Sequence, residues 1–168
     1  MFGDHGLMLK GAMHYEACTR VPLMLAGPGI PASRCGHLAS SIDIGPTILD
    51  LAGVEGYHGI QGHSLLPALG ADGQPVRGVA LVEEDQPIDM LGTGSPLRMR
   101  TIVTATHRLT VYADADCGEL YDFVDDPLEI HNLYAEPRCA GLREDLRGVL
   151  VDELLAMADT APAPTHFA

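Results

Sequence analysis

The chain has 168 residues, with 10 Lys or Arg against 23 Asp or Glu, and a formal net charge of −13 at pH 7. This acidity argues against a nucleic-acid partner, because nucleic-acid phosphates require a basic surface. No apolar run approaches the roughly 20 residues of a membrane helix, while the 46% of hydrophobic residues suffice for a core. No secretory signal is visible either, so a cytoplasmic location is the default expectation.

The first 22 residues carry a dense group of polar side chains. Asp4 and His5 lie between two glycines, and Lys10 is followed by Gly11, so a cation stands beside a flexible position. Such a loop suits an anion. The apolar run 21–26, ended by Gly-Pro-Gly, predicts a strand of a parallel sheet that is buried on both faces. Loops that precede such strands often carry functional groups.

A helix is predicted over 46–52, with Pro46 at its first position and Gly53 just past its end. Residues 53–76 are rich in glycine, proline and polar residues, which favours a loop. Strand-like runs follow at 79–84, 101–106 and 108–112, and the last two predict an antiparallel hairpin. A turn at 125–127, an amphipathic helix over 142–157 and a flexible tail over 159–168 complete the chain.

Three stretches in order carry a family resemblance. The first combines Gly-Asp-His-Gly at 3–6, Lys10-Gly11, Tyr15-Glu16 and Arg-Val-Pro at 20–22. The second joins Asp-Ile-Gly-Pro-Thr-Ile-Leu at 43–49 to Gly-His-Ser-Leu at 62–65, and the third is Glu-Leu-Tyr-Asp at 119–122 with Asp-Pro-Leu-Glu-Ile-His-Asn-Leu at 126–133. In these stretches the chain resembles the C-terminal portion of an arylsulfatase-like sulfatase of the alkaline-phosphatase superfamily.

The resemblance implies an α/β fold. Residues 1–75 would be the C-terminal piece of the main α/β/α sulfatase sandwich. Residues 76–158 would form a small antiparallel-sheet subdomain with a C-terminal helix, and 159–168 would be the tail.

For the site, the resemblance implies that Lys10 contacts the sulfate, with His14 as a second candidate that could instead pack within the loop. The resemblance disfavours Asp4 and His5 as metal ligands, because the family's ligand pair stands further upstream of its lysine. The metal pair would then lie before Met1. Intact family members use a divalent cation, Ca²⁺ or Mg²⁺, and this chain alone is expected to bind none.

Other polar residues have structural interpretations. Glu16 and Arg20, four residues apart, predict an exposed ion pair. Arg98, Arg100, His107 and Arg108 are interpreted as solvated charges at a strand edge, and Tyr121, Asp122 and Asn132 as groups that satisfy a turn.

The cysteines do not supply the family's nucleophile. Cys18, Cys35, Cys117 and Cys139 are widely spaced and lack a zinc-binding pattern. A sulfatase nucleophile is made from the Cys or Ser of Cys/Ser-x-Pro/Ala-x-Arg. The stretch 139–143 comes close to this motif, but its third position is Gly141 and it lies on a predicted helix, so we interpret the match as coincidence.

The resemblance therefore predicts a sulfatase-family protein that hydrolyses a small anionic sulfate ester in its intact form. This chain would supply the lysine loop and the C-terminal subdomain, and would be inactive alone. One alternative is a non-catalytic subunit or remnant that binds a partner or an anion, with an exposed sheet edge recruiting an oligomer or partner. Another is a phosphonate or phosphate monoester hydrolase of the same superfamily.

Overall fold

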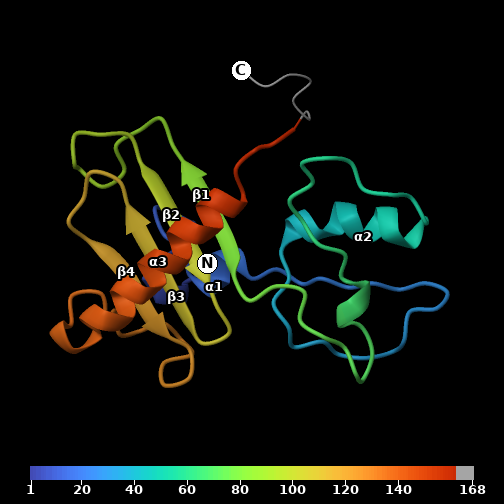
Figure 1. The fold of residues 1–168 in the computed structure, drawn as a ribbon. Coiled ribbons are helices and arrows are strands. Elements are labelled where there is room, and N and C mark those ends of the chain that lie inside the picture. The colour runs from blue at the N-terminus through green and yellow to red at the C-terminus, as the bar shows by residue number, and fades with distance from the viewer. Residues whose placement is uncertain (162–168) are drawn as a thin grey trace, which may run out of the picture. The chain divides into compact units, whose positions relative to one another are not determined.

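The computed structural model describes residues 1–161, and these form two compact units that alternate along the chain (Figure 1). One unit joins residues Met1–Leu23 to Leu81–Glu153. The other joins Met24–Ala80 to the segment that starts at Leu154. The predicted tail over 159–168 lies largely outside the described residues. No helix in the described part of the chain is long and apolar enough to cross a membrane.

The first unit is built on a four-stranded sheet in the order β1-β2-β3-β4. The strands are β1 Ala80–Asp85, β2 Arg98–Val103, β3 His107–Tyr112 and β4 Gly118–Asp122. Strands β2 and β3 pair antiparallel, as do β3 and β4, so the predicted hairpin is confirmed. The sequence did not predict β4, because its Glu-Leu-Tyr-Asp run had been interpreted as part of a turn.

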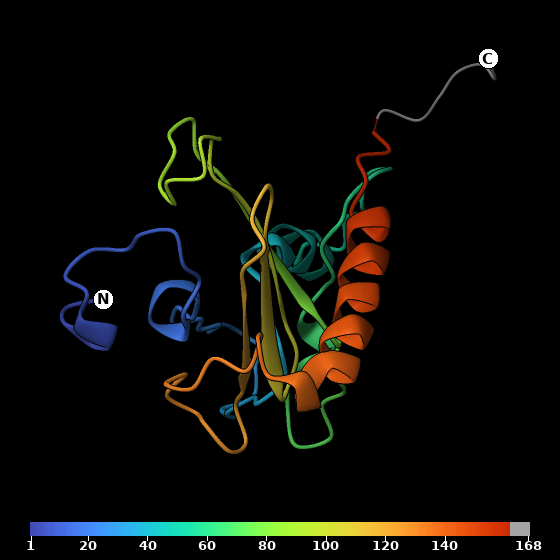
Figure 2. The same ribbon diagram turned by 90° about the vertical axis from the view of Figure 1, so that its left-hand side faces the viewer.

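The two faces of this sheet have different partners. Figure 2 shows helix α3, Ala140–Ala156, along one face and the N-terminal segment on the other. Side chains alternate between the faces of a strand. Leu109 and Leu120 are therefore on the α3 side, and Leu146 and Leu150 are the buried residues of the helix. The predicted subdomain of antiparallel sheet and C-terminal helix is thus confirmed.

Residues 21–26 do not form the predicted strand. They have no regular secondary structure, and Val21 and Met24 are 67% and 89% exposed. The physical reason is that a parallel strand needs neighbouring strands to pair with. Every strand of the described sheet comes from residues 80–122, and all lie in one meander that leaves this run unpaired.

The second unit is organised around helix α2, Ile44–Leu51, which confirms the predicted helix. A short turn at Ser41–Asp43 precedes it, and Ser40 and Asp43 form a capping box. The Asp43 carboxylate is fully buried and receives hydrogen bonds from the Arg77 Nε at 2.8 Å and the His63 backbone N–H at 2.9 Å. Burial opposes ionisation of Asp43, but these hydrogen bonds outweigh it and lower its pKa.

Candidate functional site

Lys10 lies on an exposed loop between the turn Asp4–Gly6 and helix α1, Glu16–Thr19. Among residues 1–161 its ammonium group forms no ion pair. Two residues further on, Ala12 is buried with Leu97 and Met99, and the Tyr112 hydroxyl donates to the Ala12 carbonyl at 2.9 Å. The loop is therefore fixed to the sheet close to Lys10, while the charge stays accessible.

His14 is the second point at which this segment is held. It is only 5% exposed, with Nδ1 2.8 Å from Thr101 Oγ1 and Nε2 3.1 Å from Glu84 Oε2. The Thr101 hydroxyl is in turn 2.7 Å from the Thr110 hydroxyl, which receives a hydrogen bond from Arg108 Nη1 at 2.9 Å. These groups form one chain of hydrogen bonds across three strands, buried except at Glu84.

This hydrogen-bond chain accommodates a neutral His14 ring. Arg108 can only donate and Glu84, as a carboxylate, can only accept. With a neutral ring whose Nε2–H donates to Glu84, Nδ1 of His14 accepts from the Thr101 hydroxyl, and Thr110 donates to Thr101. Burial is the main cause that lowers the pKa of His14, against the opposing hydrogen bond and charge of Glu84. A neutral ring with both nitrogens engaged inside the protein suits an anchor, and a role of His14 in substrate contact stays a prediction.

Asp4 and His5 lie in a turn that glycine geometry makes possible. Gly3 has φ = 99°, in the left-handed region that glycine tolerates at no steric cost. The His5 ring stacks on the Tyr15 ring with centroids 3.7 Å apart and planes inclined by 7°. Within residues 1–161 no group of three or more His, Cys, Asp or Glu side chains could hold a metal ion. The described residues therefore do not fit the family's divalent cation by themselves.

Arg108 anchors the start of helix α1 and was missed by the sequence analysis. The interpretation of Arg108 as a solvated strand-edge charge is wrong, because its side chain is fully buried on the face that carries the N-terminal segment. Its Nε donates to Glu129 Oε1 at 2.5 Å, and its Nη1 donates to Glu119 Oε2 at 2.6 Å. The second Glu129 oxygen accepts the Glu16 backbone N–H at 2.7 Å. Arg108 and Glu129 thus join the sheet, the loop after β4 and helix α1.

Aromatic rings complete the surroundings of the Arg108 guanidinium. The Tyr121 and Tyr15 ring centroids lie 4.7 and 5.1 Å from its central carbon. Its Nη2 is buried without a hydrogen-bond partner in the described residues, and the electron-rich faces of these rings partly compensate. Burial disfavours the charge, but the charges of Glu119 and Glu129 outweigh it and raise the pKa of Arg108. The Asp-Pro-Leu-Glu stretch marks Glu129 in the sequence, but not the arginine that it binds.

Several smaller interpretations are confirmed. Arg20 and Glu16 form the expected exposed ion pair, with Nη1 3.2 Å from Oε2. The Asn132 side chain binds the strand next to its turn: its amide donates to the Gly118 carbonyl at 2.9 Å, and its oxygen accepts the Leu120 N–H at 3.0 Å. Cys139 lies in the turn Pro137–Cys139 that leads into helix α3.

The site therefore consists of one accessible cation on a segment held by three contacts, which are the Tyr112 hydroxyl to Ala12, the buried ring of His14, and the Glu129 carboxylate to Glu16. This arrangement can bind an oxyanion through charge and through N–H donation. It holds no nucleophile of the formylglycine type and no metal-ligand set in the described residues. The chemistry that this geometry supplies is charge stabilisation.

Sulfatases are among the known proteins of similar sequence. Residues 3–155 match the family model described as N-sulphoglucosamine sulphohydrolase, C-terminal. The uncharacterized sulfatase YidJ of Escherichia coli (strain K12) is 31% identical over 95% of this chain and 31% of its own length. The N-acetylglucosamine-6-O-sulfatase of Bacteroides thetaiotaomicron is 32% identical over 95% of this chain and 29% of its own length.

Solved structures agree with the sequence matches. The structure of BT4656 in complex with its substrate D-glucosamine-2-N,6-O-disulfate gives a TM-score of 0.75 at 31% identity, and the similarity covers 99% of this chain and 34% of that one. A phosphonate monoester hydrolase of Agrobacterium radiobacter gives a TM-score of 0.64 at 25% identity, with coverage of 79% and 28%.

Each match covers only part of a longer protein. The chain spans about a third of the length of the curated relatives it matches. The family model spans nearly the whole chain and is itself a C-terminal one. This chain belongs to the sulfatase family, and it corresponds to the family's N-sulphoglucosamine sulphohydrolase C-terminal domain.

Proposed function

We propose that this chain supplies the sulfate-contacting lysine loop and the C-terminal subdomain of a sulfuric ester hydrolase. The observation that carries the proposal is the position of Lys10, an accessible cation on a loop that Tyr112 and His14 fix to the sheet. In this account residues 1–75 are a piece of the main sulfatase domain, and 76–158 are the subdomain that supports it.

The role of Lys10 in this proposal is electrostatic. Its ammonium group has three N–H donors and can bind the sulfuryl oxygens as negative charge develops on them. Because the loop is held in place before substrate arrives, little reorganisation is needed during the reaction. The net charge of −13 opposes an anionic substrate at long range, but Coulomb energy is largest at contact distance, where Lys10 acts.

Family members bind a divalent cation, and the described residues of this chain do not fit one alone. We therefore assign no step of the reaction to a metal here. For the substrate we propose the sulfate ester of an amino sugar. Support comes from a relative named N-acetylglucosamine-6-O-sulfatase and a neighbour solved with a disulfated glucosamine.

The proposal includes inactivity of the chain by itself, because its sequence lacks the nucleophile motif and its described residues contain no metal-ligand group. The test is to incubate the purified chain with a chromogenic aryl sulfate and Ca²⁺ or Mg²⁺. We expect no turnover above the protein-free blank. Metal-dependent turnover that exceeds that of a Lys10→Ala control would overturn this part of the proposal.

A second candidate is hydrolysis of a phosphonate or phosphate monoester. The structural likeness to a phosphonate monoester hydrolase favours it, and a lysine suits either oxyanion. The two proposals differ in the ester preferred by a protein that contains this chain together with a nucleophile-bearing part. Higher kcat/KM for an aryl phosphonate than for the matching aryl sulfate would favour this second candidate.

A third candidate is a subunit that binds a partner or a second copy of itself. The apolar run at 21–26 favours it, because Val21 and Met24 are largely exposed and exposed apolar patches mark interaction sites. Mass measurement in solution tests this idea. An oligomer or a stable complex is the expected result, and a well-behaved monomer at high concentration contradicts it.

A further inference from the structure

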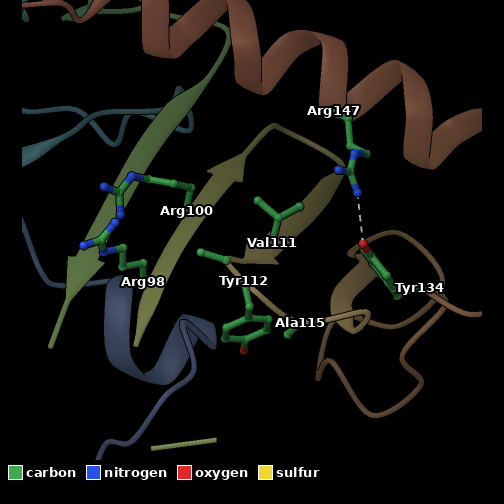
Figure 3. Close-up of a pocket in the computed structure, with 8 residues that line it drawn as sticks. Arg98, Arg100, Val111, Tyr112, Ala115, Tyr134 and Arg147 are labelled. Atoms are coloured by element: carbon green, nitrogen blue, oxygen red, sulfur yellow. Dashed lines mark hydrogen bonds between the residues drawn. The ribbon is translucent and has the colours of Figure 1, made fainter. Parts of the chain in front are cut away.

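The segment that carries Lys10 is held differently on its two sides. Downstream of the lysine, the Ala12 carbonyl accepts the Tyr112 hydroxyl at 2.9 Å, and the buried His14 ring lies 2.8 Å from the Thr101 hydroxyl. Figure 3 shows the Tyr112 ring directed away from helix α3, and its hydroxyl reaches the N-terminal segment. These contacts fix the chain from residue 12 onward.

Upstream of Lys10 the backbone forms a turn that is closed on itself. The Gly3 N–H donates to the Leu7 carbonyl at 2.8 Å, and the Leu7 N–H donates to the Asp4 carbonyl at 2.9 Å. Within residues 1–161, no backbone–backbone hydrogen bond or ion pair joins residues 2–9 to a residue beyond Lys10. The turn therefore depends on side-chain packing for its position on the fold.

The His5 side chain provides such a contact. Its ring stacks on the Tyr15 ring, with the centroids 3.7 Å apart and the planes inclined by 7°. Stacked aromatic rings attract each other beyond the effect of buried area. Lys10 lies five residues from each of the two rings, so the stack closes the segment 5–15 into a loop with the lysine at its middle.

Tyr15 is a fixed support for this stack. The central carbon of the fully buried Arg108 guanidinium lies 5.1 Å from the Tyr15 ring centroid. The Tyr15 hydroxyl is 3.4 Å from the hydroxyl of Tyr121, which is only 3% exposed. The His5 ring is therefore attached, through Tyr15, to the buried ion-pair cluster of the sheet.

The backbone of His5 has a conformation that its surroundings must maintain. Its φ of 49° and ψ of 26° are in the left-handed region. Few residues other than glycine adopt this region, although His, Asn and Asp are found there more often than the rest. Such conformations gather at functional sites, where packing holds them. The stack on Tyr15 is the packing that holds this one.

We propose that His5 is a positioning residue for Lys10. By stacking on Tyr15 it orders the upstream side of the loop, so that the Lys10 ammonium group is in place before an oxyanion binds. This preorganisation reduces the ordering that binding would otherwise have to impose. The inference rests on the proposed function for what Lys10 does, but the order of the loop can be measured without it.

The first test is ¹⁵N relaxation of the 168-residue chain and of His5→Asn. Asparagine tolerates the left-handed backbone but has no aromatic ring, so this variant removes the stack without adding strain. We expect the order parameters of the amides of 7–11 to fall from about 0.85 to below about 0.6. The amides of 12–16 should keep their values, because Tyr112 and His14 still hold that part.

Two further variants make this result specific. Tyr15→Phe keeps both rings and loses only the hydroxyl contact at 3.4 Å, so residues 7–11 should stay ordered. His63→Asn, at an exposed histidine in another part of the chain, should have no effect on them. Unchanged order of 7–11 in a folded His5→Asn overturns the proposal. So does an equal loss of order in Tyr15→Phe, because the hydroxyl and not the stack would then hold the loop.

The second test is a double-mutant cycle between His5 and Lys10. It uses a chimera in which this chain replaces the matching part of the Escherichia coli sulfatase YidJ. We expect His5→Asn to lower kcat/KM for an aryl sulfate by about 10-fold, which is the scale of one aromatic pair. In a Lys10→Ala background the same change should have almost no effect, because no lysine is left to position.

The cycle separates positioning from a general loss of folded protein. Equal losses of kcat/KM from His5→Asn with and without Lys10 overturn the proposal, because a general loss of folded protein does not depend on the lysine. If Lys10→Ala alone leaves kcat/KM unchanged, the proposed function fails instead. The relaxation measurement then still decides whether His5 orders the loop.

Discussion

At the residue scale, Arg108 connects parts of the chain that are far apart in sequence. Its ion pairs reach Glu119 on β4 and Glu129 in the loop beyond it. Glu129 also accepts a backbone N–H of helix α1. Removal of Arg108 would leave the Glu119 and Glu129 carboxylates without their counter-charge. A buried charge that loses its partner costs more than the pair contributes when intact.

We expect Arg108→Met to lower the free energy of unfolding by about 3–5 kcal/mol, since Glu119 and Glu129 would remain largely buried without a cation. Urea denaturation followed by circular dichroism measures this loss. The matched control is Arg138→Met, because Arg138 is 77% exposed and its nearest carboxylate atom is 4.0 Å away. A loss for Arg108→Met no larger than for the control would refute the anchoring role.

His14 should make stability depend on pH. Burial, the main cause, lowers the pKa of His14 in the folded state below the ordinary value of about 6.5, while Glu84, Arg108 and Glu119 are the charged groups that act on it. As pH falls through about 6.5, the unfolded chain takes up a proton that the folded chain does not. The contribution of His14 to the free energy of unfolding is therefore fully present above this pH, and it decreases as the pH falls below it.

The measurement is urea denaturation between pH 5 and pH 7.5 for the native chain and for His14→Gln. Glutamine keeps an amide donor and acceptor but does not titrate. We expect the stability difference between the two proteins to shrink as the pH decreases. Two parallel stability curves would show that His14 does not titrate in this way.

At the element scale, helix α3 supports the sheet through Leu146 and Leu150, its two buried residues. We expect Leu150→Ala to destabilise the chain by about 2–5 kcal/mol, because it removes buried methyl groups and leaves a cavity. The neighbouring Val151 is 54% exposed, and Val151→Ala should cost less than about 1 kcal/mol. Thermal unfolding compares the two variants, and equal losses would mean that α3 does not pack as described.

The elements that the sequence predicted well are those that depend on local pattern. Helix α2 has a proline at its start and a glycine past its end, and α3 has apolar residues at helical spacing. The prediction of a strand at 21–26 was wrong, because an apolar stretch becomes a strand only when other strands pair with it. Strand β4 was missed because its pairing partner β3 is a tertiary feature that the Glu-Leu-Tyr-Asp pattern does not reveal.

At the scale of the whole molecule, the sequence identified the family but only part of the site's support. The motif around Lys10 could be found because its residues are neighbours in the chain. The cluster of Arg108, Glu119 and Glu129 could not, since its members are joined only by the pairing of strands and by the loop after β4.

We propose that Lys10 stabilises the reacting sulfate in a sulfatase that contains this chain as its C-terminal part. The most direct measurement uses a chimera in which this chain replaces the matching 31% of the Escherichia coli sulfatase YidJ. The quantity measured is kcat/KM for an aryl sulfate with a divalent cation. The control is Arg20→Ala, which removes another exposed cation of the same segment.

We expect the chimera to hydrolyse the ester and Lys10→Ala to reduce kcat/KM by about 100-fold, the usual cost of removing one donor to a developing negative charge. Arg20→Ala should leave kcat/KM nearly unchanged. An active chimera that keeps its full kcat/KM after Lys10→Ala would contradict the account.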